Sequence, residues 1–363
     1  MMLFSTLGRY FFKRYVITAM WFFLGVSAII FLADFSETNR KISGLASYTL
    51  YGALGITAMR VPSILQQTIP TLSLFIGMTT LIALNRKSEL VVTRAAGLSV
   101  WQFVMPFVAG SFLLGLFTIF VVSPLGAWGL RQSSSLESTW RAESNESRNS
   151  NFLPWIRQIS DGEDTILGAK SFQQDTLTMV DVVLFHFDKD ARVILRQDAA
   201  TAKLENGYWQ LNNVLETRSD TPPTRVASAQ VRTNIKQEFL QESLEKPENV
   251  AFFDLSQKIE VARSFGISTK GLETQFHSLL SLPLLLVAMT LIASTVSLKF
   301  SRMAQSRSVI LGGIVCGFVL YVVTVLVKAF GSSGVVPPFV AVWIPVIVAM
   351  ALGATILLHQ EDG

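Results

Sequence analysis

Residues 97–131 read GLSVWQFVMPFVAGSFLLGLFTIFVVSPLGAWGLR. The first part of this stretch, Gly97 to Val122, carries no charged side chain. It is longer than the run of about 20 apolar residues that an α-helix needs to cross the hydrocarbon core of a bilayer. The stretch therefore predicts a membrane-spanning helix that gives way, near Pro124, to a polar segment.

The composition extends this prediction to the whole chain. Of the 363 residues, 50% are hydrophobic and only 15% are charged, whereas soluble domains carry about 25% charged residues. Apolar runs of spanning length recur on both sides of residues 97–122. We expect six spans, the other five being Tyr15 to Ala33, Val61 to Leu84, Thr274 to Leu298, Ser308 to Val327 and Val335 to Leu358.

Basic side chains indicate which ends of the spans face the cytoplasm, because short loops on that side are enriched in Lys and Arg. These groups are Arg9, Lys13 and Arg14 before the first span, Arg86, Lys87 and Arg94 after the second, and Lys299, Arg302 and Arg307 after the fourth. They share one side only if the uncharged stretch Ile42 to Met59 does not cross. We therefore expect an interfacial helix there, with both termini in the cytoplasm.

The N-terminal stretch from Leu3 to Tyr15 is basic and amphipathic. This pattern is typical of a helix that lies along a membrane surface. The first span is long and no small-residue cleavage pattern follows it, so the sequence does not predict a cleavable signal peptide. We expect the stretch to lie along the inner face before it turns into the first span.

A hydrophilic segment from Pro124 to Gly271 separates the third and fourth spans and is long enough for one domain. Most of it alternates apolar and polar side chains, and Asn206-Gly207 between two such runs is a hairpin signal. We expect an antiparallel β domain, a sandwich or an open roll, between residues 1–123 and 272–363. The expected elements are a helix over Arg131–Arg148, strands over Thr178–Phe187, Ala191–Gln197 and Ala199–Glu205, a loop at Pro222-Pro223 and a helix over Leu255–Phe265.

The sequence lacks the signatures of several catalytic functions. It has neither a G-x-x-x-x-G-K-[ST] loop nor a G-x-G-x-x-G motif. Its single cysteine and three histidines lie far apart, which predicts no disulfide framework and no zinc site. The span centres hold no acidic residue, which argues against a proton relay. We expect no enzyme activity, no cofactor and no nucleic-acid partner, and a partner protein as the source of energy for any transport.

The loop after the second span, residues 85–97, reads NRKSELVVTRAAG. Ser88 suits a helix N-cap, Glu89 lies at the positive end of the helix dipole, and Gly97 suits a helix stop. A short helix held between two spans at the cytoplasmic face is what a docking ATPase needs as a lever. On spacing alone, an ordinary polar turn explains the loop equally well.

The segment RKSELVVTRAAG resembles the coupling-helix motif of the LptF/LptG (YjgP/YjgQ) family, the permeases of the lipopolysaccharide-export ABC transporter. The plan of three spans, a β domain and three spans resembles that family over nearly the whole chain, and details point to its LptG branch. The other matching motifs are Ser123-Pro124-Leu125-Gly126 with Arg131, Leu282-Pro283-Leu284, Gly317-Phe318-Val319-Leu320-Tyr321 and Val336-Pro337-Pro338.

The resemblance implies a transport subunit in the inner membrane of a Gram-negative bacterium, with a periplasmic jellyroll-like domain. Such a permease pairs with an LptF-like paralogue and with two copies of a cytoplasmic LptB-like ATPase, which uses ATP and Mg²⁺. The complex extracts lipopolysaccharide from the inner membrane. It then passes the lipid through the β domains to an LptC-like periplasmic bridge protein.

The resemblance also implies roles for individual residues. The residues expected to couple to the ATPase are Glu89, Arg86, Ser88 and Leu90. Basic residues at the outer rim suit lipid phosphates because they are charge-assisted donors. These are Arg131, Arg40, Lys41 and, from its depth in the fifth span alone, Lys328. The acyl cavity is expected to include Phe31, Phe35, Phe318 and Tyr321.

Alternatives remain open for several of these residues. Snorkelling or solvated charge explains Arg40 and Lys41 equally well, and helix packing explains each aromatic residue. Gly312, Gly313 and Gly317 would allow close helix approach, at the paralogue contact or at a lateral gate. His186, His277 and Cys316 are interpreted as structural.

Two other classes of membrane protein compete with the transporter interpretation. Permeases for lipoproteins or macrolides resemble a plan of one span, a domain and three spans, which the three spans before Pro124 contradict. A membrane-anchored receptor or assembly scaffold could display a β domain, but it would need neither six spans nor a helix-forming cytoplasmic loop.

Overall fold

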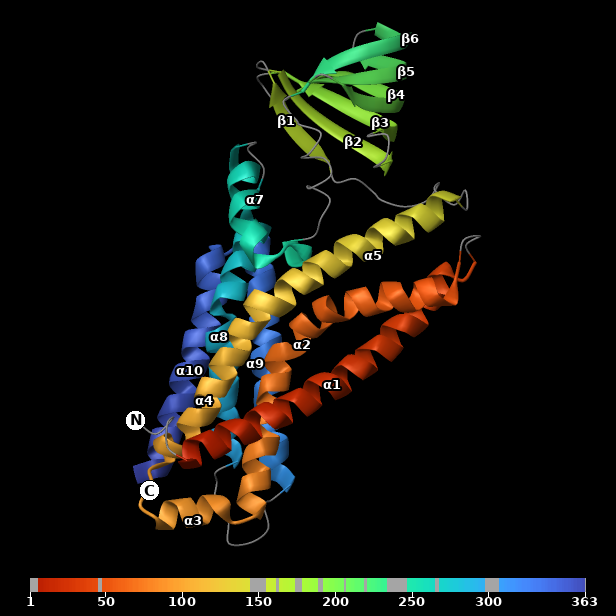
Figure 1. Cartoon of the computed structure of the whole chain (residues 1–363). Coiled ribbons are helices and arrows are strands. Elements are labelled where there is room, and N and C mark those ends of the chain that lie inside the picture. Colours follow the sequence, from red (N-terminus) through yellow and green to blue (C-terminus); the bar gives the residue numbers. More distant parts are fainter. Residues whose placement is uncertain are drawn as a thin grey trace. The chain divides into compact units, whose positions relative to one another are not determined.

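The computed structural model describes residues 6–44, 48–143, 155–160, 163–173, 178–188, 192–205, 207–218, 221–233, 247–264, 268–297 and 307–362. It divides into two compact units. Met1–Ser138 together with Pro247–Gly363 form a helical unit, and Thr139–Lys246 form a unit built on a β sheet (Figure 1).

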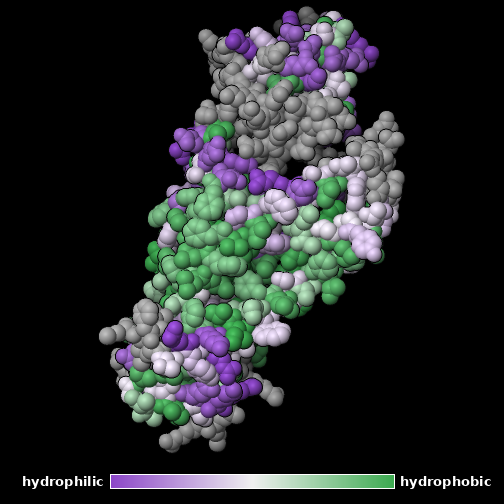
Figure 2. All heavy atoms as spheres, viewed as in Figure 1, coloured by the Kyte–Doolittle hydropathy of each residue, from purple (hydrophilic) through white to green (hydrophobic). Residues whose placement is uncertain are grey.

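Six stretches of the described helices are long and apolar enough to cross a membrane, which confirms the six predicted spans. Figure 2 shows the hydrophobic side chains gathered over the middle of the helical unit, with hydrophilic ones toward its ends. The spanning helices are α1 (Thr6–Ile42), α2 (Leu50–Arg86), α4 (Val100–Phe117), α8 (Lys270–Ser297), α9 (Arg307–Ser332) and α10 (Pro338–Asp362). The shorter ones are α3 (Glu89–Ala95), α7 (Phe252–Ser264) and η3 (Pro247–Asn249).

α8 is the central helix of the helical unit. Of its most apolar stretch 83% is buried, compared with 6% for α1 and 11% for α9. It packs against α2, α4, α9 and α10. α1 and α9 instead present large apolar side chains such as Trp21 and Phe318 on the surface, as expected for helices that face lipid or another membrane subunit.

The stretch Ile42 to Met59 does not form the separate interfacial helix that we expected. Ile42 ends α1, and Leu50 to Met59 are the first turns of α2, whose N-cap Thr49 accepts a hydrogen bond from the backbone N–H of Gly52 at 3.3 Å. Arg60 follows these turns and Pro62 lies at the start of the second span, but neither ends the helix, and α2 continues to Arg86. Pro62 and Pro70 lie inside α2, which bends in Figure 1.

The N-terminal stretch is also part of a longer helix. Residues from Thr6 onward form the beginning of α1, which runs to Ile42. The expected turn between a surface helix and the first span is therefore wrong for the described residues. Phe11 and Tyr15 are buried against the core of the helical unit, so tertiary packing outweighs the amphipathic pattern.

The third span continues past Pro124 without a break. α4 passes through a π-helical turn, η2 (Thr118–Val122), into α5 (Ser123–Glu143). The backbone N–H of Ser123 donates to the carbonyl of Thr118, five residues earlier. This wider turn accommodates the proline ring, which would clash with a carbonyl in a regular helix. The motif at residues 123–126 is therefore helical, and the polar helix that we expected from Arg131 begins before that residue.

The β unit confirms the predicted antiparallel sheet. Each described strand pairs with its neighbour in the sequence, so the sheet order is β1-β2-β3-β4-β5-β6. Within the described part of the unit these strands form one curved sheet, which agrees with the open-roll alternative (Figure 1). The strands are β1 (Ile156–Ser160), β2 (Glu163–Gln173), β3 (Thr178–Phe187), β4 (Val193–Glu205), β5 (Tyr208–Arg218) and β6 (Thr221–Arg232).

The predicted strand boundaries were right at β3 and wrong elsewhere. The two strands expected over Ala191–Gln197 and Ala199–Glu205 are one continuous strand, β4. The hairpin at Gly207 is confirmed, with φ +80° and Glu205 opposite Tyr208. Pro222-Pro223 lies within β6 and not in a loop. β6 is an edge strand, where a proline removes no hydrogen bond that the sheet requires.

The structure divides the chain at Ser138 and Pro247. We placed these boundaries at Pro124 and Gly271 because the sequence becomes polar there. The difference arises because α7 and most of α5 are polar helices that pack with the helical unit. The helix expected over Leu255–Phe265 corresponds to α7.

Two strands of the sheet contain a residue in the left-handed conformation. Asp181 of β3 and Asn213 of β5 have φ angles of +51° and +53°, which Asp and Asn tolerate better than other side chains. Met179 and Val182 of β3 are both buried although they are three residues apart, and side chains three apart on a regular strand point to opposite faces. The pairing of β3 with β4 keeps its register between them. The left-handed residue Asp181 therefore allows the same face of the strand to be buried on both sides of it.

Candidate functional site

α3 connects the second and third spans and is closed at its C-terminus by a Schellman motif. The N–H of Gly97 donates to the carbonyl of Arg94 at 2.9 Å, and that of Leu98 to Thr93 at 3.4 Å. Gly97 has φ +84°, which only glycine adopts without strain. The predicted stop is therefore confirmed. Ser88 occupies the N-cap position but makes no side-chain capping bond, because its backbone is left-handed with φ 57°.

One face of α3 is anchored to the helical unit and the other is exposed. Leu90 is fully buried in the main hydrophobic cluster. Glu89 Oε1 accepts a hydrogen bond of 3.2 Å from the hydroxyl of Tyr10 in α1, and Arg14 donates to the same hydroxyl. Val91 and Val92 are 49% and 67% exposed. α3 is thus a short helix with a buried inner face and an accessible apolar outer face.

A cavity of about 390 Å³ lies between α2, α8 and α9. Lys328 is the one charged residue among the described residues that line it. Its polar lining consists of Gln66, Gln67, Gln275, Ser63, Ser278, Ser332, Thr274, Thr324 and Tyr321. Leucine side chains complete the wall, at positions 279, 282 and 285.

Lys328 is held by an amide from the central helix. Its Nζ donates to Oε1 of Gln275 at 2.7 Å, and Gln275 is only 4% exposed. A cation, several amides and several hydroxyls around an apolar floor match a ligand with a phosphate-bearing head and acyl chains. Of the predicted site residues, the cavity brings together Lys328 and Tyr321.

The other predicted basic residues lie outside this cavity. Arg131 Nη2 is 3.7 Å from Oδ2 of Asp254 on α7. Lys41 forms an i,i+4 ion pair with Glu37 at the end of α1, and Arg40 is exposed. Ion pairs of this exposed kind contribute little stability, so these side chains can exchange their partners for a ligand.

The predicted aromatic residues are likewise divided. Phe31 and Phe35 stack on each other in α1, with ring centroids 6.3 Å apart and planes 5° from parallel. Phe318 is 59% exposed on α9, whereas Tyr321 lines the cavity. Sequence reasoning missed Gln275, although an amide within an apolar run was a signal that could have found it.

These features together define a class of protein: a multi-pass membrane protein with a β unit inserted between its third and fourth spans. A family model described as "Lipopolysaccharide export system permease LptF/LptG" matches residues 9–359. The chain belongs to this family and is a permease subunit of lipopolysaccharide export, located in the inner membrane.

Two curated relatives carry the name "Lipopolysaccharide export system permease protein LptG". The protein from Haemophilus influenzae is 22% identical, over 99% of this chain and 99% of its own length. The protein from Escherichia coli K12 is 25% identical, over 94% of this chain and 95% of its own length. These names agree with the LptG branch that the sequence motifs indicated.

Proposed function

We propose that this permease moves lipopolysaccharide through the cavity between α2, α8 and α9, driven by a cytoplasmic ATPase that docks on α3. The observation that carries the proposal is a cation in that cavity, Lys328, which is held by Gln275 and shares the cavity lining with three leucines. A phosphorylated lipid needs both a charged donor and an apolar surface, and this cavity offers them together.

The coupling to ATP hydrolysis is supported by the anchoring of α3. Leu90 ties the helix to the core, so a push on its exposed face moves α2 and α4, which flank it. Glu89 is the residue that contacts the ATPase, with Arg86 and Ser88 exposed beside it. ATP and Mg²⁺ belong to that partner and not to this chain.

The assembly consists of this chain, an LptF-like paralogue, two copies of the ATPase and an LptC-like bridge protein. The exposed apolar faces of α1 and α9 support contact with another membrane subunit. The basic residues in the loops at the opposite ends of the spans support a periplasmic location for the β unit, where it receives the expelled lipid. Arg40, Lys41 and Arg131 bind lipid phosphates at the outer rim, and Phe31, Phe35 and Phe318 contact acyl chains.

A substitution at position 328 tests the proposal. In the purified transporter complex, Lys328→Ala should lower the amount of co-purified lipopolysaccharide about tenfold, because one charge-assisted bond is lost. Lys328→Arg, which keeps the charge, should retain most of it. Lys203→Ala on β4, which removes a lysine that lies outside the cavity and pairs with Glu205, serves as the control. Equal lipid content in Lys328→Ala and Lys203→Ala would exclude this cavity from the lipid path.

A further inference from the structure

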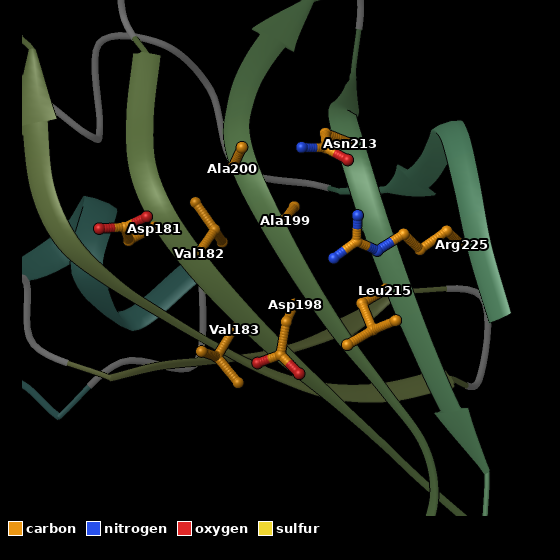
Figure 3. Close-up of a pocket in the computed structure, with 9 residues that line it drawn as sticks. All are labelled: Asp181, Val182, Val183, Asp198, Ala199, Ala200, Asn213, Leu215 and Arg225. Atoms are coloured by element: carbon orange, nitrogen blue, oxygen red, sulfur yellow. The ribbon is translucent and has the colours of Figure 1, made fainter. Parts of the chain in front are cut away.

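The exposed face of the β sheet carries a second depression, of about 320 Å³. It lies where β3, β4, β5 and β6 run side by side (Figure 3). The row Val183, Asp198, Leu215 and Arg225 crosses the four strands in register. The two left-handed residues, Asp181 and Asn213, lie to the left and to the right of Ala200 in Figure 3. Small alanine side chains between larger polar ones produce the hollow.

The polar groups around the hollow differ in their hydrogen-bonding character. In Figure 3, Asn213 and Arg225 point toward Ala199 and Ala200. Arg225 only donates, Asn213 both donates and accepts, and Asp198 accepts. Both carboxylates already have a cationic partner, because Lys170 Nζ lies 3.8 Å from Oδ2 of Asp181 and Arg196 donates to Oδ1 of Asp198 from both Nε (3.1 Å) and Nη2 (2.8 Å). The mixture of donors and acceptors around the hollow favours a ligand with many hydroxyl groups over a simple ion.

An aromatic pair adjoins the hollow on the same face. The ring centroids of Trp155 and Phe185 lie 5.9 Å apart. Gly168, which pairs with Val183 of the hollow, lets the Trp155 ring lie directly over its Cα, since an added Cβ would be 2.5 Å from that ring. Trp155 remains 52% exposed. An exposed aromatic face beside mixed donors and acceptors is suited to the C–H face and the hydroxyls of a sugar ring.

From this arrangement we infer that the exposed face of the sheet binds a saccharide unit, with Asn213, Arg225 and Asp198 contacting hydroxyls and Trp155 stacking on the ring. The inference rests on the proposed function for its source of sugar, which is the saccharide part of the lipopolysaccharide that the permease carries. A metal site fits less well, since the described residues hold no group of three or more His, Cys, Asp or Glu side chains arranged for one.

The test uses the full-length permease in its complex, solubilised in mild detergent. The probe is the lipid-free oligosaccharide that mild acid releases from lipopolysaccharide, titrated while saturation-transfer NMR and calorimetry report binding. Wild-type protein should bind it. Asn213→Gly keeps the left-handed backbone and removes only the amide, and Arg225→Ala removes the guanidinium. Each should weaken binding about tenfold, and Trp155→Ala should abolish the saturation transfer to ring protons.

Arg218→Ala is the matched control, because Arg218 is an exposed arginine of the same sheet outside the hollow. The inference would be overturned if Arg218→Ala weakened oligosaccharide binding as much as Arg225→Ala does. It would also be overturned if the wild-type protein did not bind the oligosaccharide. The same preparations are assayed for co-purified lipopolysaccharide. A wild-type complex that retains the lipid but not the oligosaccharide refutes the saccharide site alone, whereas loss of both counts against the proposed function.

Discussion

The carboxylate of Glu89 has one oxygen bonded within the chain and one that is not. Oε1 accepts a hydrogen bond from Tyr10, while Oε2 is buried without a hydrogen-bond partner among the described residues. A buried polar atom left without a partner costs roughly 1–3 kcal/mol. Because Oε2 is buried, a donor from another subunit would recover this free energy only after a movement of α3 that exposes the oxygen.

Glu89→Gln tests this role at the scale of the residue. The amide keeps an acceptor for Tyr10 but loses the negative charge, so ATPase activity that responds to lipid should fall at least tenfold if the partner supplies a cation. Tyr10→Phe removes only the intramolecular donor and should have a smaller effect. The measurement is ATP hydrolysis by the reconstituted complex. Full activity of Glu89→Gln would show that the charge is not used.

Arg131 lies beside Asp254 in the structure, and we propose a lipid phosphate as its competing partner. If its role is to bind lipid, Arg131→Ala should reduce co-purified lipopolysaccharide while Asp254→Ala should leave it unchanged or raise it. If its role is only to tie α5 to α7 across 3.7 Å, both substitutions should act alike and weakly, by about 0–1 kcal/mol of stability. Lipid content and thermal unfolding, measured side by side for both variants, distinguish the lipid-binding role of Arg131 from the structural role.

At the scale of the elements, close contacts hold the helices together around α8. α7 is joined to the spans by aromatic contacts, because Phe252 stacks on Phe276 of α8 at 5.4 Å and Phe253 meets Phe120 of η2 at 5.8 Å. The backbone N–H of Phe252 also donates to Ser123 Oγ. The helix that follows the β unit is therefore fixed to both the third and the fourth span.

The contact between α4 and α8 yields a stability prediction. A Cβ added at Gly115 would lie 2.4 Å from backbone Cα of Pro283, and neither atom can move freely. Gly115→Ala should therefore cost about 1–3 kcal/mol through overpacking. Gly312→Ala is the matched control, since nothing lies within 4 Å of its added Cβ. Thermal unfolding in detergent should show a clear loss only for Gly115→Ala; equal midpoints would contradict the packing.

At the scale of the whole molecule, the arrangement of spans predicts which loops are accessible from each side of the membrane. Cys316 is the single cysteine of the chain, so Cys316→Ser provides a clean background. In that background Ser228→Cys on β6 should react with a membrane-impermeant maleimide in intact cells with a permeable outer membrane. Lys87→Cys should react only after the inner membrane is opened, because a basic loop is expected on the cytoplasmic side. The reverse pattern would invert the topology.

The length of an apolar run and the residue types of a turn are local properties, so the sequence by itself determined the features that depend on them. Six spans follow from runs of apolar residues that must satisfy their backbone hydrogen bonds as helices. The stop at Gly97 and the hairpin at Gly207 follow from positive φ angles that glycine alone adopts easily. The family motif in the loop at residues 85–97 was equally visible without a structure.

Only the tertiary structure decided the features that depend on contacts between distant residues. Lys328 meets Gln275 across 53 positions of sequence, and no periodicity within either span predicts that pairing. The sequence likewise did not predict that α1 and α2 continue into their polar or mixed ends as single helices. Nor did it predict that Arg131 faces Asp254. The sequence did not predict the hollow at Asp181 and Asn213, because Asp and Asn adopt left-handed backbone only occasionally and nothing in the sequence marks these two positions. The hollow arises only when strand pairing brings the two residues to either side of Ala200.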